Sequence, residues 1–332
     1  MKRKFVTEYA LGYMNSYSAI VTAHQLMQGG HLEKSNQDEL DKCHIYIIAA
    51  KPTTYFNPNT LKIENDLLSG EIGYKINGNE TWVKFEGYPW RLSEGAVTIN
   101  CKYPYKEVCS YTAAGEEVRY IPAYMVAHAF TDQNGFGAND LNKYEALYVG
   151  QSIGQGNLSA QTRLLSHSTL QKILALTAHD YPDKDIVLLM YQFEHGNVFG
   201  SMDGRAKDAI NTEENEDRFI NAIHNPPNKK QKISLIEAGL IRYFHPPYNE
   251  KFKIKFPSTK HKTLQSCYKL DISALIIELD SSNLNYYLYS ENVPPQDHHI
   301  AKFDLVAPQK RQSFFNATNL TPLPDIIKAV ER

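Results

Sequence analysis

The sequence has few cysteines and no long apolar run, and each absence excludes a class of protein. Its four cysteines include no C-x-x-C pair, which argues against a zinc ribbon or a thioredoxin-type site. Four cysteines in 332 residues are too few for a disulfide scaffold, so we expect a reducing, cytoplasmic compartment. The longest apolar runs, 45–50 and 186–191, fall far short of the ~20 residues that a membrane helix needs. No membrane partner is therefore expected.

The chain also has little net charge. Lysine and arginine number 35, aspartate and glutamate number 37, and the formal net charge is −2. No strong overall field attracts nucleic acid, so any such attraction must come from a local patch. Hydrophobic residues make up 42% and charged residues 22%, which is typical of a globular protein and excludes disorder, collagen and coiled coil. At ~150 residues per domain, the length suggests about two domains or three small ones.

The first 118 residues are predicted to form an N-terminal α+β domain, for which substrate recognition is a candidate role. Apolar residues at helical spacing over 5–30 predict a helix that ends at a pair of glycines. The stretch 44–50 is a strand candidate, and the Asn77-Gly78 dipeptide indicates a turn before a short β-run at 81–85.

Residues 119–256 show strand and helix patterns in turn, and residues 257–332 are expected to form a β-containing C-terminal extension. Hydrophobic patterning predicts strands at 124–130, 145–149, 185–193 and 273–279, and helices at 159–178 and 232–244, with a polar excursion at 196–230. The predicted class is α+β.

The first chemical signal is a strand that ends in Tyr148-Val149-Gly150. Glycine allows a sharp turn and leaves the tyrosine near the edge of the sheet. Arg163 and His167 follow as an i, i+4 pair, which shares one helix face. A guanidinium and an imidazole on one face can hold a phosphate, although a solvated arginine and a packed histidine fit the same pattern.

The second signal is Glu237, at the edge of an apolar helix face beside Ile236 and Leu240. An ion there is costly unless it is paired or binds a metal. A single inward carboxylate suits Mg²⁺, which keeps several waters and shares phosphate oxygens; a surface glutamate or an ion pair is the alternative. Pro247-Tyr248-Asn249 closes this segment.

Together, these residues resemble the GIY-YIG nuclease superfamily, which includes intron homing enzymes, some restriction enzymes and the nuclease subunit of bacterial nucleotide excision repair. Tyr148-Val149-Gly150 matches the YIG element, followed by Gln151-Ser152. Arg163 matches the family's helical arginine, and His167 matches the histidine that follows it. Glu237 matches the metal glutamate, and Asn249 matches the terminal asparagine. The best candidate for the first tyrosine is Tyr124, in Pro122-Ala123-Tyr124, which lacks the glycine of the GIY element.

The resemblance covers residues 119–256 and implies a central domain with a small mixed or antiparallel sheet flanked by helices. It further implies an endonuclease that hydrolyses phosphodiester bonds with Mg²⁺ or Mn²⁺, acting on DNA rather than RNA. Tyr124, or Tyr148 with it, would accept the proton of the attacking water, and Arg163 would neutralise the phosphate. His167 would orient a tyrosine or contact phosphate, and Glu237 would hold the metal.

A basic stretch supports a nucleic-acid partner. Residues 229–262 contain nine lysines and arginines against two glutamates, a local charge of +7 in a chain of −2. Contacts from such side chains to phosphate supply most sequence-independent affinity, although a solvated basic face is the alternative. The residues expected to contact substrate are Lys229, Lys230, Lys232, Arg242, Asn249, Lys251 and Lys253.

Two other interpretations stay open. The first is a catalytically inactive nucleic-acid-binding module. The second is a serine esterase that uses Ser152, because residues 150–154 match the G-x-S-x-G pattern between a strand and a helix. Against the esterase, residues 155–157 separate the serine from its helix. Sequence alone does not distinguish restriction, defence, repair and homing, and it does not predict the oligomeric state.

Overall fold

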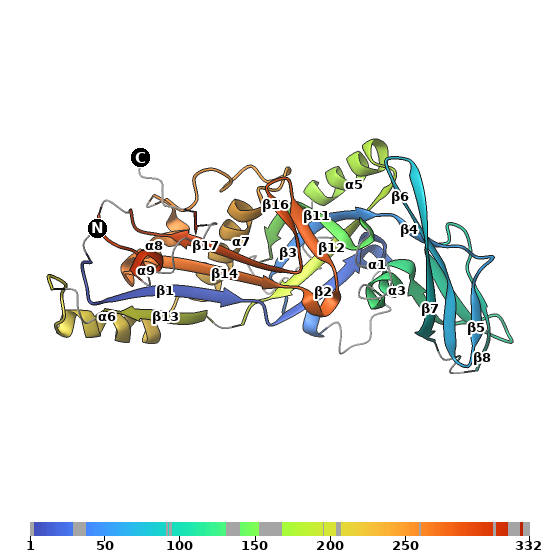
Figure 1. Ribbon diagram of the computed structural model, residues 1–332, viewed down its shortest axis with the longest axis horizontal. Coiled ribbons are helices and arrows are strands. Elements are labelled where there is room, and N and C mark those ends of the chain that lie inside the picture. Colours follow the sequence, from blue (N-terminus) through green and yellow to red (C-terminus); the bar gives the residue numbers. More distant parts are fainter. Residues whose placement is uncertain are drawn as a thin grey trace.

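Two sheets that share one buried helix form most of the molecule, and a β-rich lobe extends from one end (Figure 1). The protein is described by a computed structural model that covers residues 3–28, 38–90, 92, 95–130, 140–152, 168–194, 196–203, 207–258, 260–307, 310–317 and 326–327. The fold is α+β, with more residues in strands than in helices, as the sequence predicts.

The central sheet has six strands in the order β16-β15-β11-β3-β12-β2. Their bounds are β2 (Tyr17–Thr22), β3 (Ile45–Pro52), β11 (Lys143–Gln151), β12 (Lys184–Gln192), β15 (Tyr287–Ser290) and β16 (Val293–Gln296). Strand β3 lies in the middle and pairs antiparallel with both β11 and β12. Its first seven residues are all buried, because both faces of the sheet are covered, which explains its unbroken apolar sequence.

The second sheet has five strands in the order β13-β1-β14-β17-β18. Their bounds are β1 (Thr7–Met14), β13 (Gly196–Met202), β14 (Ala274–Asp280), β17 (His298–Asp304) and β18 (Ile326–Ile327). Strand β1 pairs in parallel with β14, from the opposite end of the chain. Both sheets therefore run across the domain boundaries expected at residues 118 and 256.

The shared helix is α7 (Lys229–Phe244), which confirms the helix predicted at 232–244. It begins at a capping box in which Asn228 and Gln231 bond each other's backbone N–H, and it ends at His245 in the left-handed conformation. One core contains apolar residues of this helix, of β3 and of β14. A Cβ on Gly239 would overlap Ile277 of β14, so glycine allows the helix to approach that sheet closely.

A lobe of residues 53–142 is inserted between β3 and β11 and is called the β lobe below. Its elements are β4 (Thr54–Phe56), β5 (Lys62–Glu64), β6 (Leu67–Ile76), β7 (Asn79–Pro89), β8 (Ala96–Asn100), β9 (Glu107–Thr112), β10 (Glu117–Pro122), α3 (Ala123–Ala129) and η1 (Asp140–Asn142). The lobe has its own core around Trp90, Phe56 and Phe85. The predicted Asn77-Gly78 turn joins β6 to β7, and both residues have the positive φ of a tight hairpin.

The remaining helices cover the sheets from outside. They are α1 (Ala23–Gln28), α5 (Ser168–Asp180), α6 (Glu213–His224), α8 (Gln265–Lys269), α9 (Phe314–Ala317), η2 (Lys262–Leu264) and η3 (Ser282–Leu284). Helices α1 and α5 pack on the face of the central sheet opposite α7, through Leu26, Leu170 and Ile173. Apolar side chains from a helix thus cover each face of the central sheet.

The strands predicted at 44–50, 145–149, 185–193 and 273–279 are confirmed, but three other predictions are wrong. Within the predicted helix at 5–30, the described residues up to 28 form β1, β2 and α1 instead of one helix. The sequence did not show this, because β1 is buried on both faces and its apolar run therefore lacks the alternation of a strand. Residues 124–130 form helix α3 instead of a strand, since a short apolar run does not distinguish the two. The excursion at 196–230 contains β13 and α6.

The structure bears on two features noted in the sequence, the lack of a long apolar run and the four cysteines. Within the ranges that the structure describes, no helix is both long and apolar enough to cross a bilayer. All four cysteines lie in these ranges, and each is a buried free thiol. Burial raises the pKa of Cys43 to about 12, so this thiol stays protonated and unreactive at neutral pH.

Candidate functional site

The Tyr148-Val149-Gly150 sequence forms the end of β11, where that strand lies against the start of β3. Gly150 is paired with Tyr46, and the Tyr46 and Tyr148 rings stack with their centroids 6.3 Å apart. A Cβ on Gly150 would overlap the Tyr46 ring and hydroxyl. Glycine at this position therefore lets one tyrosine cross β11 and pack against the other.

Tyr46 is the residue that the sequence interpretation missed. It lies in the predicted strand 44–50, within Ile45-Tyr46-Ile47, but the β lobe separates it from Tyr148 by about a hundred residues. A search for a tyrosine on any predicted strand that could pair with β11, rather than for a match to the GIY element in 119–256, would have included it. The structure thus brings two tyrosines together at the end of β11, and one of them is not the expected one.

Tyr124, the expected first tyrosine, lies elsewhere. It belongs to helix α3 of the β lobe, so it is not on a strand beside Tyr148 as predicted. Its ring lies 5.3 Å from the Lys51 ammonium, and burial raises the pKa of its phenol. A phenol whose pKa is raised is a poorer candidate for a general base at neutral pH.

Glu237 reaches the same end of β11 from helix α7. Gln151, which follows Gly150, donates a hydrogen bond from Nε2 to Oε2 of Glu237 over 2.7 Å. The Ser234 hydroxyl donates to Oε1 of Gln151 over 3.4 Å. Lys230, Ser234 and Glu237 have the spacing of one helix face. The half-buried carboxylate is therefore held next to the tyrosine strand by a residue of that strand.

Asn249 is tied to the middle residue of the tyrosine motif. Its buried side chain accepts a hydrogen bond from the Val149 N–H and donates one to the Val149 carbonyl, both over 2.9 Å. The adjacent Tyr248 N–H donates to the carbonyl of Leu147. The amide thus positions β11, a role that the sequence did not predict for Asn249, and its expected contact with substrate stays a prediction.

His44 is a further polar group at this end of the sheet that sequence reasoning did not select. It precedes β3, and its carbonyl accepts a hydrogen bond from the Ser152 N–H over 2.9 Å. Its Nδ1 is buried and has no hydrogen-bond partner among the described residues. Burial and the nearby Lys229 and Lys232 lower its pKa, so the imidazole is neutral at pH 7.

Arg163 and His167 lie outside the described residues, which resume at Ser168, the first residue of α5. The predicted helix at 159–178 is therefore confirmed only for its second half. Helix α5 packs on the face of the central sheet to which Tyr46 and Tyr148 also contribute.

The predicted basic patch divides into exposed side chains and side chains that bond the backbone. Lys229, Lys230 and Lys251 are exposed. The other three of the six cations expected to contact substrate donate to main-chain carbonyls, Lys232 to Phe193 and Glu194, Arg242 to Lys253, and Lys253 to Pro247. Burial lowers the pKa of Lys232 and of Arg242. Phosphate contacts are thus open to the first group, while the second group stabilises the chain around α7.

The ligand set for a metal is small. Among the described residues, no three histidine, cysteine, aspartate or glutamate side chains gather closely enough to hold an ion. The amide N–H of Gln151 faces Glu237 and its oxygen accepts from Ser234, so Glu237 is the one direct ligand that these two residues offer. A single carboxylate fits Mg²⁺, which keeps most of its waters and takes the remaining ligands from a substrate phosphate.

Ser152 does not have the surroundings of an esterase nucleophile. It is only 2% exposed, and its hydroxyl donates to the Cys43 carbonyl over 3.4 Å. A nucleophilic serine of this pattern instead projects from a sharp turn into the site. Residues 153–154 of the pattern lie outside the described residues.

At one end of the central sheet, two stacked tyrosines lie on the face covered by α5, and a carboxylate held by the adjacent strand lies on the side of α7. A neutral histidine and exposed lysines lie at the same end. Phenols and a carboxylate near cations suit chemistry on a phosphate ester. Comparison of this chain with protein-family models, with curated proteins and with solved structures finds no match in any of the three.

Proposed function

We propose that this protein is a Mg²⁺- or Mn²⁺-dependent endonuclease of the GIY-YIG type that hydrolyses phosphodiester bonds, of DNA rather than RNA. The observation that carries the proposal is the hydrogen bond between Gln151 and Glu237, which joins the Tyr-Val-Gly strand to a carboxylate 86 residues later. Two parts of the motif that are distant in sequence thus meet in space, as shared chemistry requires.

In this proposal Tyr46 replaces Tyr124 as the first tyrosine of the motif. The pairing of Tyr46 with Gly150 and its stacking on Tyr148 support the assignment. Tyr148 is the better proton acceptor of the two, because it is half-buried whereas Tyr46 is fully buried. A free phenol has a pKa of ~10, so it can act as a base at neutral pH only where nearby cations favour the phenolate.

The remaining roles follow the electrostatics of the reaction. Glu237 is the residue that would hold Mg²⁺, and the bound ion would supply charge neutralisation at the phosphate. Gln151 fixes the orientation of that carboxylate. Arg163 is proposed to neutralise charge that grows on the phosphate in the transition state, and His167 to contact phosphate or a tyrosine. Lys229, Lys230 and Lys251 are proposed to bind neighbouring phosphates.

The test is incubation of the purified protein with supercoiled, linear and single-stranded DNA and with RNA, each with and without Mg²⁺. We expect Mg²⁺-dependent nicking or cutting of DNA. Binding without cleavage would favour the inactive module, and covalent labelling of Ser152 by a serine-directed probe would favour the esterase. Cleavage that persists in a chelator would contradict the role of the metal.

A further inference from the structure

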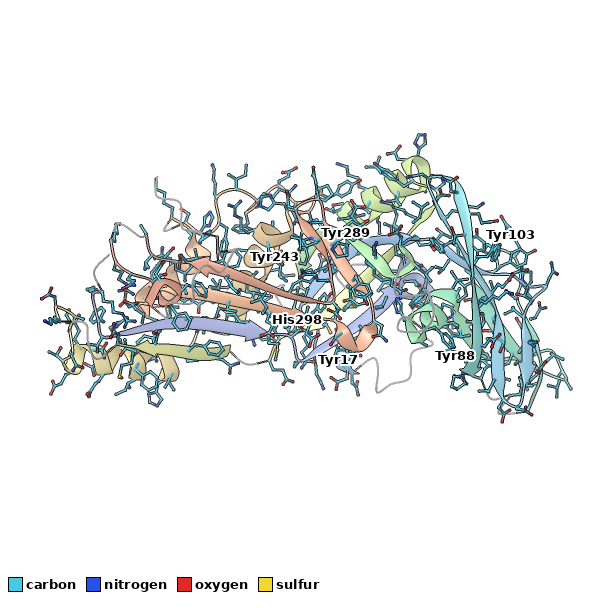
Figure 2. All side chains as sticks on the ribbon, in the orientation of Figure 1. Tyr17, Tyr88, Tyr103, Tyr243, Tyr289 and His298 are labelled. Carbon is cyan, nitrogen blue, oxygen red and sulfur yellow. The ribbon has the colours of Figure 1, made fainter. Side chains whose placement is uncertain are left out.

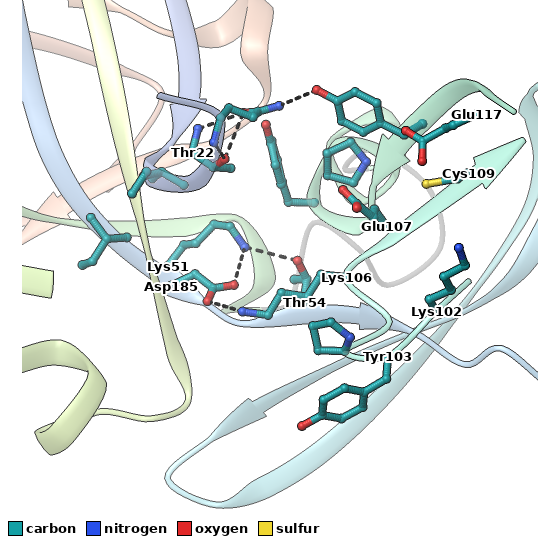
Figure 3. Close-up of a pocket in the computed structure, with 18 of the residues that line it drawn as sticks. Thr22, Lys51, Thr54, Lys102, Tyr103, Lys106, Glu107, Cys109, Glu117 and Asp185 are labelled. Carbon is teal, nitrogen blue, oxygen red and sulfur yellow. Dashed lines mark hydrogen bonds and ion pairs between the residues drawn. The ribbon is translucent and has the colours of Figure 1, made fainter. Parts of the chain in front are cut away.

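A pocket lies between the central sheet and the β lobe, away from the stacked tyrosines (Figure 3). Its volume is about 810 Å³, and residues of α1, β12 and α5 line one side. Residues of β9, β10 and the turn at 102–106 line the other side. Sites for single small organic ligands are typically ~300–1,000 Å³, so one nucleotide could enter. We call this pocket the lobe cleft.

Two lysines share one carboxylate at the base of the lobe cleft (Figure 3). Lys51, on β3, is only 2% exposed, and its Nζ lies 3.9 Å from Oδ2 of Asp185. Lys106 lies 2.7 Å from Oδ1 of the same residue. Burial lowers the pKa of Lys51 to about 8, so it still carries its proton at pH 7. Two ammonium groups on one carboxylate leave a net positive charge that suits a phosphate.

An aromatic ring projects from the rim of the same cleft. Tyr103 is 85% exposed and lies at the β-lobe end of the molecule (Figure 2). Its ring meets that of Tyr105 edge-on, at 5.8 Å between centroids. The turn is held in place, because the carbonyl of Tyr105 accepts from the Phe56 N–H and that of Lys106 accepts from the Ala123 N–H. A fixed, exposed ring is a suitable platform for a nucleobase.

We propose that the lobe cleft binds an unpaired nucleotide of the nucleic-acid substrate, with its base stacked on Tyr103 and its phosphate near Lys51 and Lys106. The identity of the ligand as nucleic acid rests on the proposed function. Glu107 and Glu117 also line the cleft and repel phosphate, so the phosphate belongs at the lysine end. Their carboxylates can accept hydrogen bonds from the amino groups of a base.

The first test measures binding of a fluorescein-labelled single-stranded 20-nucleotide DNA by anisotropy in EDTA. We expect Tyr103→Ala to weaken binding about tenfold, the usual effect of losing one stacking ring. Lys106→Ala, at the more exposed of the two lysines assigned to the phosphate, should reduce the slope of log affinity against log salt by ~0.7. The matched control is Tyr181→Ala, because Tyr181 is 57% exposed but does not line the cleft. An equal loss in both tyrosine variants, or no loss in Tyr103→Ala, would overturn the proposal.

The second test separates this proposal from the proposed function. Wild type and Tyr103→Ala are assayed in Mg²⁺ on a fully paired duplex and on a set of the same duplexes with a two-nucleotide gap placed at successive positions. We expect wild type to prefer one of the gapped duplexes and the variant to lose that preference. If both proteins cleave the paired and gapped duplexes equally well, the role of the lobe cleft is refuted and the proposed nuclease activity stands. If binding depends on Tyr103 but no DNA is cleaved, the nuclease activity is refuted and the role of the lobe cleft stands. If no nucleic acid binds, both proposals are refuted.

Discussion

Nε2 of Gln151 donates a hydrogen bond to Oε2 of Glu237 over 2.7 Å, and this contact fixes the end of strand β11 against the middle of helix α7. The strand residues before Gln151 are the Tyr148-Val149-Gly150 motif, and Gly150 faces Tyr46 on β3. Glu237 lies on the α7 side of the sheet, and the two phenolic rings pack on the face covered by α5. The proposed nuclease activity therefore depends on a substrate phosphate that reaches both groups around the end of β11.

Three Tyr→Phe variants test which phenol accepts the proton. We expect Tyr148→Phe to slow cleavage at least ~10²-fold, the lower range for loss of a general base. Tyr46→Phe should have a smaller effect, because Tyr46 is buried and orients its neighbour by stacking. Tyr124→Phe should cleave at the wild-type rate, since Tyr124 lies in the β lobe. Initial rates of plasmid nicking measure all three, and a large loss in Tyr124→Phe alone would restore the assignment predicted from the sequence.

Arg163→Ala tests the proposed phosphate contact. We expect a loss of at least ~10²-fold in the rate of the chemical step, because an interaction made with charge that develops in the transition state is removed. Single-turnover kinetics separates this loss from a change in affinity. The control is Lys172→Ala, an exposed cation on helix α5. A weaker affinity with an unchanged single-turnover rate would make Arg163 a binding residue only.

Asn249→Ala tests the positioning role of the asparagine. The variant leaves the buried N–H and carbonyl of Val149 without partners, and each such group costs about 1–3 kcal/mol. We expect the free energy of unfolding to fall by ~2–5 kcal/mol, measured by urea denaturation. Asn225→Ala, at the exposed end of α6, should change stability far less. Unchanged stability with lost DNA binding would instead support the substrate contact predicted from the sequence.

His128 gives the protein a pH-dependent stability. Its Nε2 lies 2.7 Å from the Tyr144 hydroxyl, and burial, with a contribution from Lys51, lowers its pKa to about 3. Between pH 3 and the ordinary pKa of ~6.5 the unfolded chain binds the extra proton, so stability rises with pH in this window and falls as the pH drops. We expect this residue to contribute a slope of about 1.4 kcal/mol per pH unit. The slope is measured by denaturing wild type and His128→Gln at several pH values between about 4 and 7. If the free energy of unfolding depends on pH in the same way in both proteins, the contribution of His128 is refuted.

Local patterns predicted the elements that carry the candidate site better than they predicted how the chain connects them. Helix α7 could be located because its apolar spacing and the two prolines after it agree. Strands β3, β11, β12 and β14 could be located from short apolar runs. The buried strand β1 and helix α3 could not, because short fully apolar segments have the same composition in either state.

The partner of Tyr148 could not be predicted because pairing between strands is a property of the whole fold. The insertion of residues 53–142 places Tyr46 far from β11 in sequence, although β3 and β11 are neighbours in the sheet. The sequence interpretation therefore chose Tyr124, the nearer tyrosine. The lobe cleft was also beyond prediction, because it forms between parts of the chain that no local pattern relates.

The metal role of Glu237 is tested most directly by the Mg²⁺-dependent rate of plasmid nicking by Glu237→Gln. Glutamine removes the charge but can keep the hydrogen bond with Gln151, so folding should be nearly unchanged. Glu250→Gln, at an exposed glutamate beyond the same helix, is the matched control. We expect that at saturating Mg²⁺ Glu237→Gln loses at least ~10²-fold in rate while Glu250→Gln stays at the wild-type rate. Wild-type cleavage by a folded Glu237→Gln variant would contradict the proposed mechanism.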